Sequence, residues 1–195
     1  MDQFMLYDHH INFIIKKANG VLLFLNRIQD NFDRTYRMIV IQSLALSIIN
    51  YFHKVWGMTT REQLERVQKI ENFAAKIAYG GARKYDHVTP ILKDLQWMDI
   101  KDKISFDICV FMYKVMNNML PDWLHKFPFV GDLQARPTRQ SNHLAIKRTN
   151  TDLGKRAISV RGPKEWNDIP VNIRNSTSIK VFQKNLKKHI LSSSF

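Results

Sequence analysis

Residues 10–29, HINFIIKKANGVLLFLNRIQ, carry the pattern that decides the fold of this 195-residue chain. Apolar residues recur there every three or four positions, which predicts a helix with one apolar side. This stripe comprises Ile11, Ile14, Ile15, Ala18, Val21, Leu22, Leu25 and Ile28. Similar stripes follow through the first 120 residues, where Pro90 is the sole proline. Together they predict an N-terminal helical bundle.

Four further helices are expected before Pro121, each with its own apolar stripe. They lie at about 34–56, 59–79, 90–95 and 99–120. The stripe of the first of them comprises Met38, Ile41, Leu44, Ala45, Ile48, Phe52 and Val55. Further apolar residues widen it and favour a central position for that helix; they are Ile39, Val40, Leu46 and Ile49. Thr59 with Glu62 three residues later predicts a capping box at the start of the next. Gly80 and Gly81 accept left-handed geometry and are expected to end it.

The pattern changes after Pro121, where the remaining prolines lie. Short apolar–polar alternation in 143–149 and 156–161 predicts two strands that pair as a hairpin across 150–155. Pro163 and Pro170 are expected to bracket a rigid turn in which Trp166 fills the core. A closing helix is expected over 178–191. The predicted fold class is therefore mainly α, with a helical bundle over 1–124 and a small basic α+β segment over 125–195.

The chain is strongly basic, and the excess is concentrated near its C-terminus. It carries 30 Lys and Arg against 17 Asp and Glu, a net charge of +13. Residues 134–195 hold 13 Lys and Arg against three Asp and Glu, which gives this segment a charge of +10. Such a density of cations favours an anionic partner and could neutralise several phosphates. The alternative interpretation is a solvated face on a basic protein.

The residues predicted to contact the phosphate backbone of a nucleic acid are the basic residues around the expected hairpin. They would form a ridge along which successive phosphates bind. They are Arg136, Arg139, Lys147, Arg148, Lys155, Arg156, Arg161 and Lys164.

Residues for self-contained catalysis are missing from the sequence. No two acidic residues are adjacent, which argues against a site that holds two metal ions. The chain has no Gly-rich phosphate loop and neither the GxSxG nor the HExxH motif. Its single cysteine, Cys109, lies in an apolar stretch and is expected to be buried rather than reactive. We expect no catalytic residue, metal, cofactor or small-molecule substrate. The alternative is a catalytic site whose residues are dispersed along the sequence.

Membrane insertion is not expected either. The most apolar stretch, 38–52, contains Gln42, Ser43, Ser47 and Asn50, and it is shorter than the roughly 20 apolar residues that span a bilayer. The first ten residues lack the basic start and apolar run of a secretory signal. The expected location is therefore intracellular, nuclear or cytoplasmic.

Several stretches, taken in chain order, resemble one protein family. They are LYDHHI (6–11), KANG (17–20), YFHKVWG (51–57), LERVQKIENFAAKI (64–77), PIL (90–92), LQW (95–97), LPDWL (120–124), TRQS (138–141), GPKEWNDIP (162–170) and FQKNLK (182–187). In this order they resemble the region that follows the polymerase palm in the reverse transcriptase of non-LTR retrotransposons, the LINE type that includes the jockey clade. The resemblance covers nearly the whole chain.

The resemblance implies a thumb-like helical region that packs on a primer–template duplex, followed by a basic tail. Its implied partners are the RNA or DNA backbone and the polymerase palm. The family's paired catalytic aspartates match no position here, so no catalytic residue carries over. The expected function is that of a truncated C-terminal fragment of an RNA-directed DNA polymerase, which binds nucleic acid without an active site of its own. The alternative is a helical protein-interaction module from a decayed element, with no nucleic-acid role.

Overall fold

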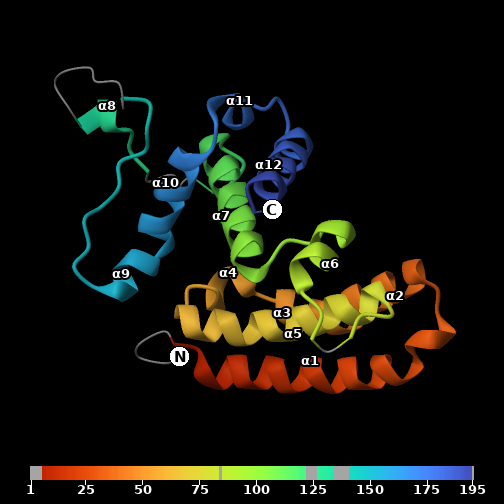
Figure 1. The fold of residues 1–195 in the computed structure, drawn as a ribbon. Helices are drawn as coiled ribbons and strands as arrows, with labels where there is room; N and C mark the ends of the chain where they lie inside the picture. The colour runs from red at the N-terminus through yellow and green to blue at the C-terminus, as the bar shows by residue number, and fades with distance from the viewer. Residues whose placement is uncertain (1–5, 84, 122–126, 134–140, 195) are drawn as a thin grey trace. The chain divides into compact units, whose positions relative to one another are not determined.

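The computed structural model describes residues 6–83, 85–121, 127–133 and 141–194, and this part of the chain is mainly helical (Figure 1). The predicted fold class is confirmed in this respect. The chain forms two compact units, Met1–Ile104 with Ser193–Phe195, and Ser105–Ser192. Their boundary falls earlier in the chain than the expected division after residue 124.

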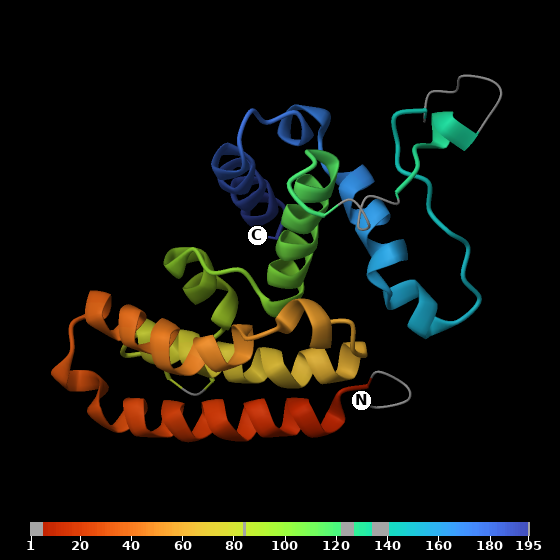
Figure 2. The same ribbon diagram turned by 180° about the vertical axis from the view of Figure 1, so that it is seen from behind.

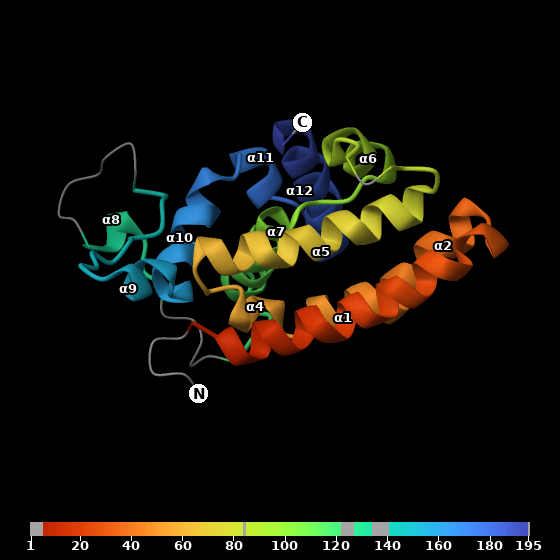
Figure 3. The same ribbon diagram turned by 60° about the horizontal axis from the view of Figure 1, so that its bottom comes forward.

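The first unit is built around α1 (Asp8–Ile28), which contacts α5 (Arg61–Tyr79) and the broken helix that starts with α2 (Arg34–Val40). Figures 2 and 3 show these helices running alongside one another. The helix predicted over 10–29 is confirmed, and its buried side follows the predicted stripe. The buried residues of α1 are Ile11, Ile14, Ala18, Leu22 and Leu25. A short 3₁₀ turn, η1 (Gln29–Asn31), follows it.

The helix expected over 34–56 is interrupted. After α2 comes a π-helical segment, η2 (Ile41–Leu46), and the chain continues through α3 (Ser47–Asn50) and α4 (His53–Trp56).

The π-helical segment explains why the predicted stripe is partly wrong. Leu44 and Phe52 were expected on the buried side but are 53% and 62% exposed. Leu46, Ile49 and Trp56 are buried instead. A π turn holds more residues than an α turn, so Leu44 and the residues after the segment are rotated relative to a regular helix. Phe52 follows a second break, where Tyr51 is extended and Phe52 has a left-handed φ of 54°.

The start of α5 also differs from the prediction. The helix begins at Arg61, and the Thr59 hydroxyl donates a hydrogen bond to the carbonyl of Leu6 at 2.6 Å. The capping box is therefore wrong, because Thr59 is buried and its side chain ties the turn before α5 to the segment before α1. The predicted helix end is confirmed, since Gly80 and Gly81 have φ of 76° and 72°.

Two helices follow α5. The short helix α6 (Val88–Leu95) starts two residues earlier than expected, with Pro90 in its first turn, where its missing N–H is not needed. The long helix α7 (Ile100–Met116) begins in the first unit and continues into the second.

A buried ion pair joins the start of α7 to α5. The Lys103 ammonium lies 2.6 Å from the Glu71 carboxylate, which is almost wholly buried. Burial raises the pKa of Glu71, and the neighbouring Lys103 charge opposes this shift.

The second unit packs α7 against α10 (Ile158–Asp168) and α12 (Ile179–Ser194). Their contact is aromatic: the Tyr113 and Phe182 rings stack at 4.4 Å, and Trp166 lies 6.0 Å from Phe182 between ring centroids. The Tyr113 hydroxyl donates to the Ser176 carbonyl at 2.8 Å. Trp166 is buried as predicted. Three short helices complete the described part of the unit: α8 (Val130–Leu133), α9 (Asp152–Arg156) and α11 (Val171–Arg174).

The predicted hairpin is wrong. Residues 156–161 lie at the end of α9 and the start of α10 rather than in a strand. The Thr151 side chain caps α9 by accepting from the Gly154 amide at 3.1 Å, so the expected turn is a helix start. Pro163 lies inside α10, so the rigid turn expected there is helical as well.

Residues 143–149, the first of the two expected strands, form hydrogen bonds with other parts of the second unit. Leu144 forms an isolated antiparallel bridge with Phe129. The Asn167 side chain accepts from the Leu144 amide and donates to its carbonyl, both at 2.9 Å. A side-chain amide therefore takes the place that a neighbouring strand would have filled.

Candidate nucleic-acid interface

The structure distributes the predicted contact residues over three segments of the second unit. Arg136 and Arg139 lie outside the described residues. Lys147 and Arg148 are exposed on the extended segment before α9. The other four are on two helices: Lys155 and Arg156 on α9, and Arg161 and Lys164 on α10.

The basic residues of α9 interact with the start of their own helix. The Lys155 ammonium lies 3.2 Å from the Asp152 carboxylate, with both side chains exposed. The Arg156 guanidinium donates to the Asp152 carbonyl at 3.3 Å. Thr149 approaches Gly154 so closely that a Cβ there would lie 2.9 Å from the Thr149 Cβ. This contact brings Arg148, the preceding residue, close to α9.

Arg161 has a different environment from the other predicted contacts. Its guanidinium pairs with the Glu165 carboxylate and donates to the Ser105 hydroxyl at 3.2 Å, and both charged side chains are largely buried. Burial raises the pKa of Glu165, whereas the Arg161 charge and the hydrogen bonds oppose the shift. Arg161 therefore links α10 to α7 within the unit.

Cys109 lies on α7 close to this ion pair. It is buried, as expected, and burial raises the pKa of its thiol. A thiol with a raised pKa carries little thiolate, so the side chain behaves as a small apolar group.

A further set of exposed cations lies on α12. We call the four exposed residues Lys180, Lys184, Lys187 and Lys188 the lysine face. At about 100° per residue they fall within an arc of about 100°, on the side of the helix away from Phe182 and Leu186, which are buried. Within the described residues, no carboxylate pairs with any of the four.

The lysine face is not among the contact residues predicted from the sequence, although the sequence carries a signal for it. The four lysines have the i, i+4, i+7, i+8 spacing of one helical side. No Asp or Glu follows Asp168 in the chain, so nothing nearby in sequence neutralises them. The apolar stripe of the expected closing helix predicts only its buried side, and the four lysines lie opposite that stripe.

The lysine face and the basic residues of α9 form two separate surfaces of the second unit. Figures 1 and 2 show α7 between α10 and α12, with α9 beyond α10. The predicted residues therefore do not form a single ridge with the lysine face.

The part of the chain that the structure describes contains no group of three His, Cys, Asp or Glu side chains arranged to hold a metal ion. None of its helices has the length and apolar content needed to cross a membrane. Comparisons with protein-family models, curated proteins and solved structures gave no match.

Proposed function

We propose that this chain is the C-terminal, post-palm part of a non-LTR retrotransposon reverse transcriptase, and that it binds the phosphate backbone of RNA or DNA without an active site of its own. The lysine face is the observation that carries the binding proposal. The ordered stretches that resemble this family support the assignment to a reverse transcriptase.

The geometry of the lysine face suits a row of phosphates. Lys180 and Lys188 are separated by about 12 Å along the helix axis at 1.5 Å per residue. Duplex DNA carries one negative charge per about 1.7 Å of its axis, so several phosphates fall within that length. Lysine side chains are long and flexible, and their ammonium groups bind phosphate as point charges. Such contacts position a protein on nucleic acid without reading its sequence.

The exposed basic residues Lys147, Arg148, Lys155 and Lys164 are proposed as a second, weaker backbone contact. Lys155 has an exposed carboxylate nearby, and an exposed pair of this kind adds little stability, so it can exchange for a phosphate.

Filter binding of the purified chain to an RNA–DNA primer–template at rising salt tests this function. If each lysine of the lysine face neutralises one phosphate, log K should fall against log salt with a slope of about −3.6 or steeper. Raising the salt from 50 to 200 mM would then weaken binding by about 150-fold or more. Absent binding, or binding that salt does not weaken, would overturn the proposal.

A second candidate, a helical protein-interaction module, is favoured by apolar side chains exposed on the first unit. Phe13, Leu23 and Phe24 point away from the buried side of α1, and Tyr36 and Ile39 are exposed on α2. Apolar residues gathered on a surface commonly mark an interaction site.

A pulldown after nuclease treatment separates the two candidates. A protein partner that resists nuclease and is lost in a Phe13→Ser/Phe24→Ser variant would favour the interaction module. Partners that appear only when nucleic acid is present would count against it.

A further inference from the structure

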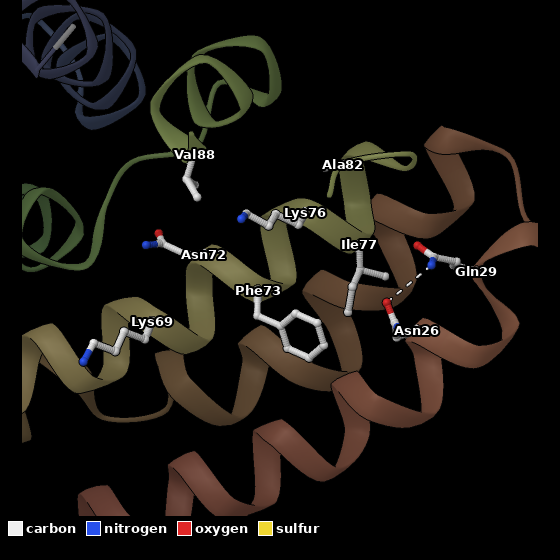
Figure 4. Close-up of a pocket in the computed structure, with 9 residues that line it drawn as sticks. All are labelled: Asn26, Gln29, Lys69, Asn72, Phe73, Lys76, Ile77, Ala82 and Val88. Carbon is white, nitrogen blue, oxygen red and sulfur yellow. Dashed lines mark hydrogen bonds between the residues drawn. The ribbon is translucent and has the colours of Figure 1, made fainter. Parts of the chain in front are cut away.

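The first unit contains a pocket of about 540 Å³ bounded by the end of α1, one side of α5 and the start of α6 (Figure 4). This volume lies within the range of about 300–1,000 Å³ that is typical of small-molecule sites. Five residues of α5 line it at helical spacing, from Lys69 to Ile77. The side chains drawn in Figure 4 divide into a polar set and an apolar set.

The polar end of the pocket offers hydrogen-bond donors and positive charge. Lys69, Asn72 and Lys76 point to the same side of α5 in Figure 4. The Asn72 carbonyl oxygen already accepts from Gln68 at 2.7 Å, which leaves its NH₂ group to donate into the pocket. Lys76 donates to the Arg83 carbonyl at 3.3 Å, which holds its ammonium at the rim. The described lining residues include no Asp or Glu.

The one acidic group whose interaction with Lys69 is seen within the described residues does not cancel this charge. Glu65 interacts electrostatically with Lys69, but its carboxylate is paired with Arg61 at 2.7 Å. The polar end therefore suits an anion with several oxygen acceptors, such as a phosphate.

The apolar end of the pocket offers a flat surface. The Phe73 ring points away from the lysines, toward Asn26 of α1, and the buried Ile77 side chain lies behind this end of the pocket (Figure 4). Phe73 is only half-buried, so one part of its ring remains open to a ligand. The Asn26 carbonyl oxygen accepts from Gln29 at 3.3 Å, which leaves its NH₂ group to donate to a polar ring edge.

We infer that this pocket binds a nucleoside 5′-phosphate, with the base against Phe73 and the phosphate between Lys69 and Lys76. A nucleotide joins a planar ring to a phosphate, which matches the two ends of the pocket. Every base has a π face that stacks on an aromatic ring. The ligand could be a free mononucleotide or the 5′-phosphorylated end of a strand. The inference goes beyond the proposed function, because the lysine face takes no part in it.

Isothermal titration of the full chain with adenosine 5′-monophosphate, adenosine and inorganic phosphate tests the inference. The monophosphate should bind at least about tenfold more tightly than either part alone, because only it occupies both ends. Equal affinity for the monophosphate and inorganic phosphate would overturn the role of Phe73, and no binding of the monophosphate would overturn the whole inference.

Two variants test the apolar end and the polar end of the pocket separately. Phe73→Leu should weaken adenosine and monophosphate binding by about tenfold and leave phosphate binding unchanged. Lys76→Gln should weaken monophosphate and phosphate binding by about tenfold and leave adenosine binding unchanged. The matched controls Phe13→Leu and Lys93→Gln, both at exposed positions outside the pocket, should change nothing.

A measurement on the chain without substitutions does not depend on whether the variants fold. In methyl NMR spectra, the monophosphate should shift the Ile77 and Val88 signals, and unshifted signals would contradict the inference. Competition by a 5′-phosphorylated oligonucleotide, but not by its 5′-hydroxyl form, would identify the strand end as the ligand. Lys180→Gln/Lys184→Gln should weaken primer–template binding without changing the monophosphate affinity, so failure of one proposal is distinct from failure of the other.

Discussion

Replacing Phe182 by alanine is expected to lower the free energy of unfolding of the second unit by about 3–5 kcal/mol. Phe182 is completely buried, and its ring contacts both Tyr113 of α7 and Trp166 of α10. Alanine would leave a cavity at the point where three helices meet, and well-packed helices close such cavities only in part. Urea unfolding followed by circular dichroism measures the loss.

The neighbouring variant Val181→Ala serves as the control, because Val181 is 43% exposed on the same helix. Its free energy of unfolding should change by less than about 0.5 kcal/mol, as is usual for surface substitutions. The two variants should also differ in their affinity for the primer–template. Loosening of α12 in Phe182→Ala should weaken primer–template binding, whereas Val181→Ala should bind normally. A loss below about 1 kcal/mol in Phe182→Ala would show that the aromatic cluster is not the core of this unit.

The second large effect is expected when all four residues of the lysine face are changed to glutamine. The slope of log K against log salt should become shallower by about 3.6, because about 0.9 counterion is released for each phosphate neutralised. Filter binding to the same primer–template measures both slopes. Glutamine keeps the length and helix preference of lysine to a close approximation, so the fold of α12 should be unaffected.

A second quadruple variant with the same change in net charge shows whether the effect is local. Lys16, Lys17, Lys93 and Lys101 are exposed lysines of the first unit, and their replacement by glutamine also removes four positive charges. This control should alter the slope far less than the lysine-face variant. Equal effects of the two variants would mean that overall charge, rather than the lysine face, determines binding.

The sequence predicted the long helices well, because their apolar periodicity is regular. The stripe of α1 and the glycines after α5 appear in the structure as expected. The stripe through 34–56 was predicted with the wrong register, because a π-helical segment at Ile41–Leu46 leaves no signal in a pattern based on 3.6 residues per turn. Exposure of Leu44 follows from this shift and could not be derived from composition.

The C-terminal third shows a different limit of sequence reasoning. The alternation of Ile158 and Val160 is too short to separate a strand from a helix. In the structure, Val160, Pro163 and Trp166 share the buried side of α10 at a spacing of three, which is a helical pattern. The partner of Leu144 is the side chain of Asn167, 23 positions away, and no local rule predicts such a pairing.

The candidate interface could be predicted only in part. Net charge located the basic segment, but it could not distinguish Arg161, which is held by Glu165 and Ser105, from the exposed Lys164. Ser105 lies 56 positions before Arg161, so this contact depends on the tertiary fold. The lysine face was within reach of sequence reasoning, since its spacing and the lack of acids after Asp168 are both visible in the chain.

Protection of individual lysines from acetylation tests the central claim most directly. The chain is treated briefly with an acetylating reagent, with and without the primer–template, and the modification of each lysine is measured by mass spectrometry. We predict that Lys180, Lys184, Lys187 and Lys188 become protected by the nucleic acid, while Lys16 and Lys93 react at the same rate in both samples. Unchanged acetylation of the lysine face in a sample with bound primer–template would contradict the account.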